Sequence, residues 1–140
     1  MSEASTPPDL VEVTRRSFET GNRRDFDLLS GFFAPDAVFD LSQVGLARFE
    51  GLEAIREFIE DWWGAYEEFE AEAEEVLDLG NGVTFATIFQ TGRPVGSSGD
   101  VALRYWAVNL FVGGMIVQTT NYLDLDEGRA AAERLAGESR

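Results

Sequence analysis

Uncharged hydrogen-bonding side chains alternate with apolar ones along the C-terminal part of the sequence. Residues 100–112 and 115–124 are predicted to be two strands of a hairpin around Gly113-Gly114. Side chains of a strand point alternately to its two faces, so a three-residue loop at 112–114 gathers one polar set on a single face. That face holds Tyr105, Ala107, Asn109, Phe111, Val117, Thr119, Asn121 and Leu123. An apolar wall with a few convergent polar groups is typical of a pocket for a small apolar molecule.

Two alternatives to this arrangement stay open. In the first, the amides of Asn109 and Asn121 only satisfy neighbouring backbone groups. In the second, the glycines form a two-residue turn, which places Asn109 beside Gln118 and changes the side chains that share its face.

The opposite face of the predicted hairpin is apolar. It holds Trp106, Val108, Leu110 and Ile116 in one contiguous patch. If no helix covers such a patch, a second subunit is expected to bury it. The sequence therefore predicts a homodimer through this outer face of the sheet.

Three residue types that carry much of enzyme chemistry are missing from the chain. Its 140 residues include no His and no Cys, and all eleven basic residues are Arg. This excludes His bases and His-ligated metals, thiolate nucleophiles, Schiff-base lysines and Walker-type phosphate loops. Proton transfer is left to Asp, Glu, Tyr or a chain terminus, and we predict neither a metal nor an organic cofactor.

Length and charge limit the partners further. A chain of 140 residues with 44% hydrophobic residues fits a single globular domain. We predict a flexible arm over 1–8, one domain over 9–136 and a tail over 137–140. The net charge of −15 repels nucleic acid phosphates and anionic lipids, so we expect neither nucleic acid nor membrane as a partner. The N-terminus lacks the basic and apolar regions of a signal peptide, which predicts a cytoplasmic location.

Helical periodicity fills the first half of the chain, and strand periodicity fills the second. Helices are predicted over 9–20, over 24–33 with Pro35 as the stop, and over 52–66, with a strand over 37–41 and a loop over 42–49. Later strands begin at 69, 83, 100 and 115, and a short helix over 127–136 follows. Helices followed by a long antiparallel sheet predict an α+β fold in which a bent sheet closes on helices as a cup.

Three aromatic rings crowd the C-terminal end of the third predicted helix: Trp62, Trp63 and Tyr66. They either line the wall of the cup or fill its core, and the core is favoured for either tryptophan taken singly. The predicted ligand-binding residues are Trp62, Tyr66, Tyr105, Asn109, Thr119 and Asn121.

Several segments resemble a known superfamily. They are FAPDAV at 33–38, FEGLEAIREF at 49–58, GMIV at 114–117 and YLD at 122–124. On these segments the chain resembles the SnoaL-like and ketosteroid-isomerase-like members of the nuclear transport factor two superfamily. The resemblance implies a cone-shaped, strongly bent mixed β-sheet wrapped around three N-terminal helices, with a short C-terminal helix. It also implies a pocket at the open end and, commonly, a dimer through the outer face of the sheet.

The resemblance implies catalytic positions as well. Ketosteroid isomerases use a carboxylate base near the first strand and an oxyanion hole of a Tyr and a protonated Asp. The base position falls on Asp40 or Leu41, whereas the other two positions fall on Thr14 and Ala107, which lack those groups. SnoaL-like cyclases use an Asp base, often with His partners, and His is absent here. Asp40 is therefore the candidate catalytic residue.

Three functions stay open at this point. The first is an isomerase-like or cyclase-like enzyme in which Asp40, desolvated in the pocket, acts as general base. The second is a non-catalytic cup for an apolar metabolite, which needs the same wall and polar groups but no base. The third is a dimerisation domain with a filled pocket. For Asp40 the alternative is a strand-end carboxylate that accepts backbone N–H bonds.

Overall fold

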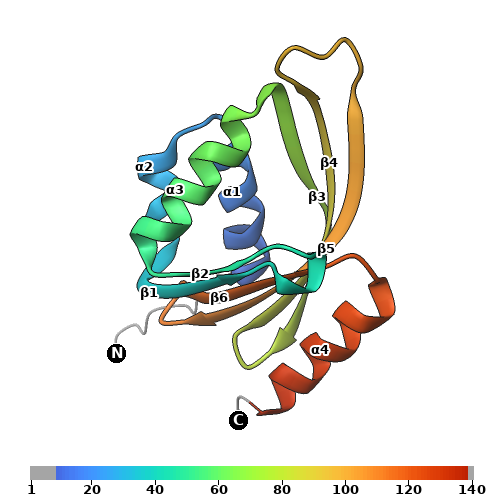
Figure 1. The fold of residues 1–140 in the computed structure, drawn as a ribbon. Coiled ribbons are helices and arrows are strands. Elements are labelled where there is room, and N and C mark those ends of the chain that lie inside the picture. The colour runs from blue at the N-terminus through green and yellow to red at the C-terminus, as the bar shows by residue number, and fades with distance from the viewer. Residues whose placement is uncertain (1–8, 139–140) are drawn as a thin grey trace.

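The computed structural model describes residues 9–138, which form one curved six-stranded sheet with helices on both of its faces (Figure 1). The strand order is β2-β1-β6-β5-β4-β3, in which β1 and β6 are parallel and the other neighbours are antiparallel. Helices α1, α2 and α3 fill the concave side, and α4 packs on the convex side. The elements are α1 (Leu10–Asn22), α2 (Phe26–Ser30), β1 (Phe33–Asp40), a 3₁₀ turn (Ser42–Val44), β2 (Arg48–Glu50), α3 (Leu52–Gly64), β3 (Tyr66–Gly80), β4 (Val83–Pro94), β5 (Val101–Val112), β6 (Met115–Tyr122) and α4 (Leu125–Glu138).

The predicted α+β cone is confirmed, with a mixed sheet bent around three N-terminal helices and a short C-terminal helix. The predicted arm over 1–8 and residues 139–140 of the predicted tail lie outside the described residues. Residues 137 and 138 of that tail belong to α4, which is longer than predicted at both ends.

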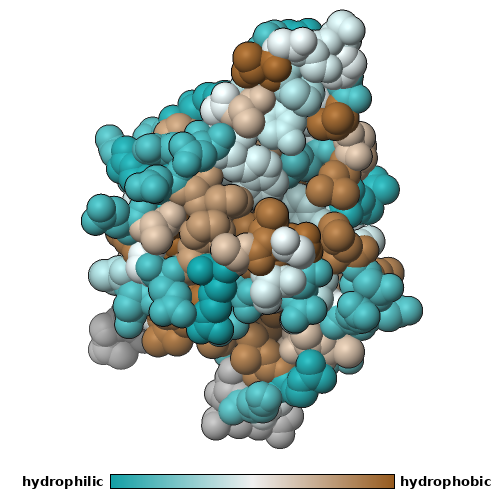
Figure 2. Space-filling view, in the orientation of Figure 1, coloured by the Kyte–Doolittle hydropathy of each residue, from teal (hydrophilic) through white to brown (hydrophobic). Residues whose placement is uncertain are grey.

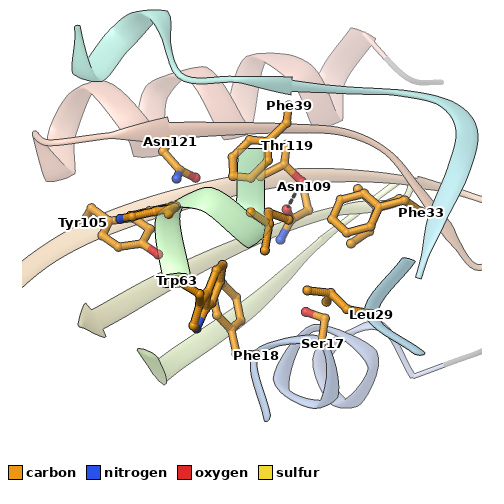
Figure 3. Close-up of a pocket in the computed structure, with 13 residues that line it drawn as sticks. Ser17, Phe18, Leu29, Phe33, Phe39, Trp63, Tyr105, Asn109, Thr119 and Asn121 are labelled. Atoms are coloured by element: carbon orange, nitrogen blue, oxygen red, sulfur yellow. Dashed lines mark hydrogen bonds between the residues drawn. The ribbon is translucent and has the colours of Figure 1, made fainter. Parts of the chain in front are cut away.

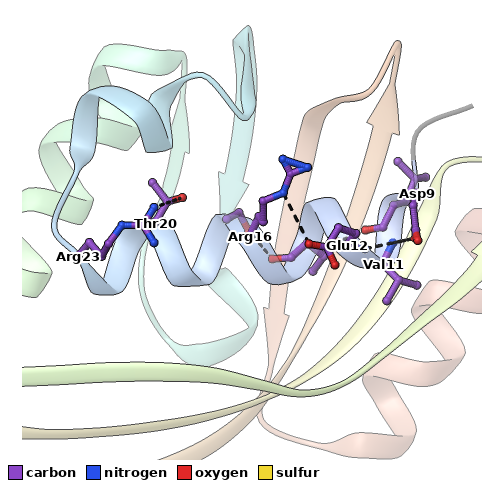
Figure 4. Close-up of polar contacts among 9 residues, drawn as sticks. Asp9, Val11, Glu12, Arg16, Thr20 and Arg23 are labelled. Atoms are coloured by element: carbon purple, nitrogen blue, oxygen red, sulfur yellow. Dashed lines mark hydrogen bonds and ion pairs between the residues drawn. The ribbon is translucent and has the colours of Figure 1, made fainter.

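Helix α1 begins where the sequence predicts, at a capping aspartate (Figure 4). One carboxylate oxygen of Asp9 accepts from the backbone N–H groups of Val11 and Glu12 at 3.1 and 3.2 Å. These bonds satisfy donors that the first turn of a helix leaves free. On the exposed side of the helix, Glu12 pairs with Arg16 one turn later at 3.7 Å, a contact that adds little stability.

The second helix is shorter than predicted because the chain becomes a strand at Phe33. Asp25 caps it through the Leu28 amide at 3.1 Å, and it ends at Ser30. Pro35 does not stop a helix but lies inside β1, between Phe33 and Val38, where the pairing with β6 shifts register. Proline has no N–H to donate, so this break in the ladder is a position that tolerates it.

Two further boundaries differ from the predictions. The predicted loop over 42–49 holds the 3₁₀ turn and the start of β2, which pairs with the end of β1. Helix α3 ends at Gly64, two residues earlier than predicted, so Tyr66 opens β3 instead of closing the helix. Tyr66 continues the helical spacing of the aromatic residues past the true end of α3, and for this reason the helix was predicted to be too long.

Helix α1 also protects the exposed edge of the sheet. Strand β3 lies at one edge, where backbone groups lack a strand partner. The Asn22 side chain donates to the Ala71 carbonyl at 2.9 Å and accepts from the Ala71 amide at 2.8 Å. The guanidinium of Arg15 donates to the Ala73 carbonyl, and that of Arg24 donates to the Tyr66 carbonyl at 3.1 Å. These side chains hydrogen-bond to backbone groups of β3 that would otherwise need a neighbouring strand.

The last hairpin combines features of both predicted registers. Val112 pairs with Met115, so the loop is the two-residue turn, in which Gly113 and Gly114 have φ values of 62° and 82°. Both central residues of such a turn need positive φ, which glycine adopts at little cost.

A β-bulge then shifts the pairing of β5 with β6. Phe111 pairs with Ile116 but Leu110 pairs with Gln118, so Val117 is the extra residue. Beyond the bulge Asn109 lies opposite Thr119, and neither predicted register gave that pair. Facing pairs point to the same side of a sheet, so both side chains reach the concave face as predicted.

The two-residue turn moves one member of the predicted outer patch, because it places Ile116 opposite Phe111. Ile116 lies on the concave side, 3% exposed and packed with Leu29 and Phe33, so its placement on the outer face is wrong. Val108 does lie on the convex face, but α4 covers it through Ala132 and Ala136. The remaining members, Trp106 and Leu110, are half-buried around the same cluster.

Candidate functional site

A cavity of about 60 Å³ lies between the three N-terminal helices and the concave face of the sheet (Figure 3). Every helix of that group contributes side chains to it, together with β1, β5 and β6. The lining residues are Ser17, Phe18, Leu29, Phe33, Phe39, Ile59, Trp62, Trp63, Tyr105, Asn109, Ile116, Thr119 and Asn121. All of them are uncharged at neutral pH, because the one titratable group among them is the phenol of Tyr105.

The apolar wall is built from aromatic rings on helices that approach each other closely. Trp62 and Trp63 of α3 lie 5.7 Å apart between ring centroids, and the Trp63 ring is 4.6 Å from that of Phe69. Gly21 of α1 permits this approach, because a Cβ atom there would lie 3.2 Å from the Trp63 ring. The close-up draws both Trp63 and Phe18 among the side chains that line the cavity.

The polar wall is a buried chain of hydrogen bonds. The Thr119 hydroxyl donates to Asn109 Oδ1 at 2.7 Å, and Asn109 Nδ2 donates to Thr84 Oγ1 at 3.2 Å. Thr84 contacts the Thr14 hydroxyl at 3.3 Å, and Thr14 donates to the Leu10 carbonyl at 2.8 Å. This chain ties the centre of the sheet to α1 and fixes the rotamers of both cavity-facing members, Asn109 and Thr119.

Other polar groups at the cavity keep unused hydrogen-bonding capacity. Within the described residues, Asn121 Oδ1 and Trp63 Nε1 are buried without a partner. Such atoms are uncommon in folded proteins because each costs about 1–3 kcal/mol. Burial raises the pKa of the Tyr105 phenol far above its usual value, so this hydroxyl keeps its proton at neutral pH and can donate.

Comparison with protein families gives a match over most of the chain. Residues 14–119, which include all of the lining residues except Asn121, match the SnoaL-like domain family. This chain is a member of the SnoaL-like domain family. Comparison with curated proteins finds no match.

Solved structures support the same fold for this SnoaL-like domain. A protein from Catenulispora acidiphila with a ketosteroid isomerase-like fold, crystallised with trimethylamine, shares 16% identity over 91% of this chain and 94% of its own, with a TM-score of 0.71. An NTF2-like protein of unknown function from Burkholderia pseudomallei shares 18% over 90% and 98%, with a TM-score of 0.72. An epoxide hydrolase-like protein of M. tuberculosis shares 16% over 88% and 91%, with a TM-score of 0.66. Identities this low establish the fold of the family and not a shared activity.

The SnoaL-like domain brings together five of the six predicted ligand-binding residues. Tyr105, Asn109, Thr119 and Asn121 line the cavity from β5 and β6, and Trp62 lines it from α3. The sixth is outside it: Tyr66 opens β3, packs its ring 5.2 Å from that of Phe69 and lies against Gly92.

The candidate base lies away from the cavity. Phe39 is among the lining residues, so the next residue of β1, Asp40, points to the opposite face of the sheet. There it accepts from the hydroxyl of Ser42 at 2.6 Å and from its amide at 2.9 Å. The Ser42 hydroxyl bond is the main reason that the pKa of Asp40 is lowered, whereas a pocket base needs a raised one. Leu41, the alternative base position, is an apolar residue of the concave core.

Some cavity residues on α1, α2 and β1 were not predicted from the sequence, namely Ser17, Phe18, Leu29, Phe33 and Phe39. A usable signal for α1 was the run of small residues at 14, 17 and 21, which all lie on its buried face. Among residues 9–138, no cluster of three or more His, Cys, Asp or Glu is arranged to hold a metal ion. In the same range, no helix combines the length and the apolar character that a membrane span requires.

Proposed function

We propose that this SnoaL-like domain binds a small, largely apolar, uncharged molecule in the cavity beneath Trp62 and Trp63. The observation that carries the proposal is a pair of buried polar atoms at this apolar cavity, Asn121 Oδ1 and Trp63 Nε1, that have no partner within the described residues. A bound molecule with its own polar group would satisfy them, and its apolar body would contact the aromatic rings.

The size of the cavity limits the ligand. A volume of about 60 Å³ holds a molecule of only a few non-hydrogen atoms, well below the ~300–1,000 Å³ of pockets for drug-sized ligands. The similar protein from Catenulispora acidiphila was crystallised with trimethylamine, which is a molecule of this size class. Larger ligands would require α3 or α1 to move away from the sheet.

Binding is favoured over carboxylate-based catalysis by the position of the acidic groups. A general base must come within hydrogen-bonding reach of the proton that it removes. Within the described residues, no Asp or Glu lines the cavity, and Asp40 is held by Ser42 on the opposite face. The proposed function therefore needs no proton transfer by a carboxylate.

The test is a titration with cyclopentanol, a molecule of six non-hydrogen atoms, followed through the indole N–H signals of the protein in ¹H–¹⁵N NMR spectra. The chain has three tryptophans. Trp62 and Trp63 line the cavity, whereas Trp106 lies on the convex face and serves as an internal control. We expect saturable shifts of the first two signals. Since a ligand of six non-hydrogen atoms gains at most ~1.5 kcal/mol per atom, or about 9 kcal/mol in total, the titration covers the range from micromolar to millimolar concentrations. Equal shifts of all three signals, or no saturation, would contradict the proposal.

We also propose a homodimer and a cytoplasmic location for this SnoaL-like domain. A homodimer through the convex face would use the part of that face around Trp106 and Leu110 that α4 leaves partly open. Light scattering of the purified chain over a concentration series tests it, since a monomer throughout would contradict a dimer.

A cytoplasmic location also stays a prediction, and fractionation of the source cells tests it.

A further inference from the structure

We propose that the cavity selects ligands that carry an O–H or N–H donor, because its polar wall presents hydroxyl oxygens whose own protons are already used. This inference rests on the proposed binding function and adds the chemical class of the ligand. It follows from the direction of each hydrogen bond in the buried chain.

The direction is set at the helix end of the chain. A threonine hydroxyl has one proton, and that of Thr14 is donated to the Leu10 carbonyl. In the contact between Thr14 and Thr84, the proton must therefore come from Thr84. The Thr84 hydroxyl then has only lone pairs left for its other contact, so the Asn109 amide must point its N–H group toward it.

The same reasoning carries the direction to the cavity. Because Asn109 turns its N–H group toward Thr84, its carbonyl oxygen faces Thr119, and Thr119 must donate to it. The one proton of the Thr119 hydroxyl is then used in the bond to Asn109, so the hydroxyl offers only lone pairs to the cavity that it lines. The series of hydrogen bonds that begins at the Leu10 carbonyl thus determines that Thr119, at its other end, presents an acceptor to the cavity.

A second hydroxyl at the cavity, that of Ser17, can also act only as an acceptor, for a separate reason. Ser17 of α1 donates its proton to the Thr14 carbonyl at 2.7 Å, which leaves its lone pairs for any molecule beside it. The buried carbonyl oxygen of Asn121, 96% shielded as a residue and without a partner within the described residues, adds a third acceptor.

Donors line the cavity as well, because the Asn121 amide carries an NH₂ group beside its carbonyl oxygen. The indole N–H of Trp63 has no partner within the described residues, and the Tyr105 hydroxyl is protonated. A ligand hydroxyl suits both sides, since it donates one proton and accepts at its oxygen. An ether accepts only, and a carboxylate brings a charge that no cationic side chain in the lining would balance.

The test compares two isomers of formula C₅H₁₀O, cyclopentanol and tetrahydropyran. Both have six non-hydrogen atoms and one oxygen acceptor, and only the alcohol has a donor. We expect cyclopentanol to bind about five- to tenfold more tightly, as measured by the shifts of the Trp62 and Trp63 indole signals. Equal affinities would overturn the donor requirement while leaving the proposed binding function intact. Failure of both molecules to bind would overturn both.

Substitutions then locate the acceptors. In the double variant Ser17→Ala with Thr119→Val, we expect the preference for the alcohol to fall by at least half, with the remainder due to the carbonyl oxygens of Asn109 and Asn121, while tetrahydropyran binds as before. Thr119→Ser keeps the hydroxyl and should keep the preference. The matched control is Thr120→Val, the same change one residue later on the convex face, which should also keep it. An undiminished preference in the folded double variant would overturn the assignment to Ser17 and Thr119, and if that variant fails to fold, the isomer pair on the unsubstituted chain still decides the donor requirement.

Discussion

At the scale of single residues, burial decides what each polar group can do. Tyr105, a predicted ligand-binding residue, and Asp40, the predicted base, both carry a titratable group, and the environments of these two groups differ. The first is enclosed beside aromatic rings, and burial raises its pKa. The second lies at a strand end, where the Ser42 hydroxyl lowers its pKa. The cavity therefore contains a neutral donor, and the carboxylate stays outside it.

The raised pKa of Tyr105 predicts a loss of stability at high pH. In the unfolded chain this phenol ionises near pH 10, whereas in the folded protein it stays protonated to higher pH. Its contribution to stability is thus complete below pH 10 and declines as the pH rises through the folded-state pKa. We expect Tyr105→Phe to flatten the fall in the free energy of unfolding above pH 10, as measured by urea unfolding. The same slope in both proteins would show that this phenol is not protected.

At the scale of elements, side-chain hydrogen bonds from α1 protect the free edge of the sheet. Strand β3 is fifteen residues long and lies at the edge of the sheet, but side chains of α1 occupy its free backbone groups. Figure 2 shows hydrophobic residues mixed with hydrophilic ones on one face of the molecule. The large hydrophobic residues that are exposed lie in loops and in or near the ends of strands and helices. They are Leu28, Leu46, Val95, Val101, Leu103, Val112, Leu123 and Leu125.

Replacing the edge contact should weaken β3 locally. We expect Asn22→Ala to lower the free energy of unfolding by about 1–3 kcal/mol, because it leaves both backbone groups of Ala71 without their partner. Hydrogen exchange of the Ala71 amide should speed up more than that of residues in β5. The control is Arg16→Ala on the exposed side of the same helix, which should cost less than about 0.5 kcal/mol. Equal effects of the two changes would argue against an edge role.

The turn between β3 and β4 gives a second prediction at this scale. Gly82 has φ of 83°, and a Cβ atom there would lie 2.4 Å from the Phe111 carbonyl oxygen. Gly80 has a similar φ of 88° but open space around it. We expect Gly80→Ala to cost about 1–2 kcal/mol from backbone strain alone and Gly82→Ala to cost clearly more. Thermal unfolding of the two variants compares them, and equal losses would show that the backbone yields at Phe111.

At the scale of the whole molecule, the sheet separates two apolar regions with different partners. The concave face meets α1, α2 and α3 around the cavity, and the convex face meets α4 over Val83, Phe85 and Val108. Asn81 ties the far end of α4 to the sheet by donating to the Ala136 carbonyl at 2.7 Å. The C-terminal helix is thus a cover for a surface that would otherwise be exposed.

Loosening this cover should change the association state of the protein and spare the cavity. Ala132 of α4 is fully buried against the convex face of the sheet, so Ala132→Glu would bury a carboxylate without a partner and displace the helix. We expect the variant to self-associate through the exposed convex face, as seen by light scattering, while cyclopentanol still shifts the Trp62 and Trp63 signals. Glu133→Ala, an adjacent change on the exposed side of α4, is the control. A monomeric Ala132→Glu variant would contradict the idea that α4 covers an adhesive surface.

The sequence by itself determined the layout of the fold and most of the polar wall. Period-two alternation put Tyr105, Asn109, Thr119 and Asn121 on one face, and helical spacing placed Trp62 nearby. These assignments depend on local geometry, which neighbouring residues encode directly.

Tertiary structure alone decided the rest. The two-residue turn moved Ile116 inward, and the bulge at Val117 brought Thr119 opposite Asn109. The alternation of side chains along β1 put Phe39 into the cavity and therefore Asp40 outside it. The donor direction at Thr119 depends on Thr14, which is distant in the sequence and reached through Thr84. No local pattern encodes such a contact, because each hydroxyl acquires its role only from the partner that packing brings to it.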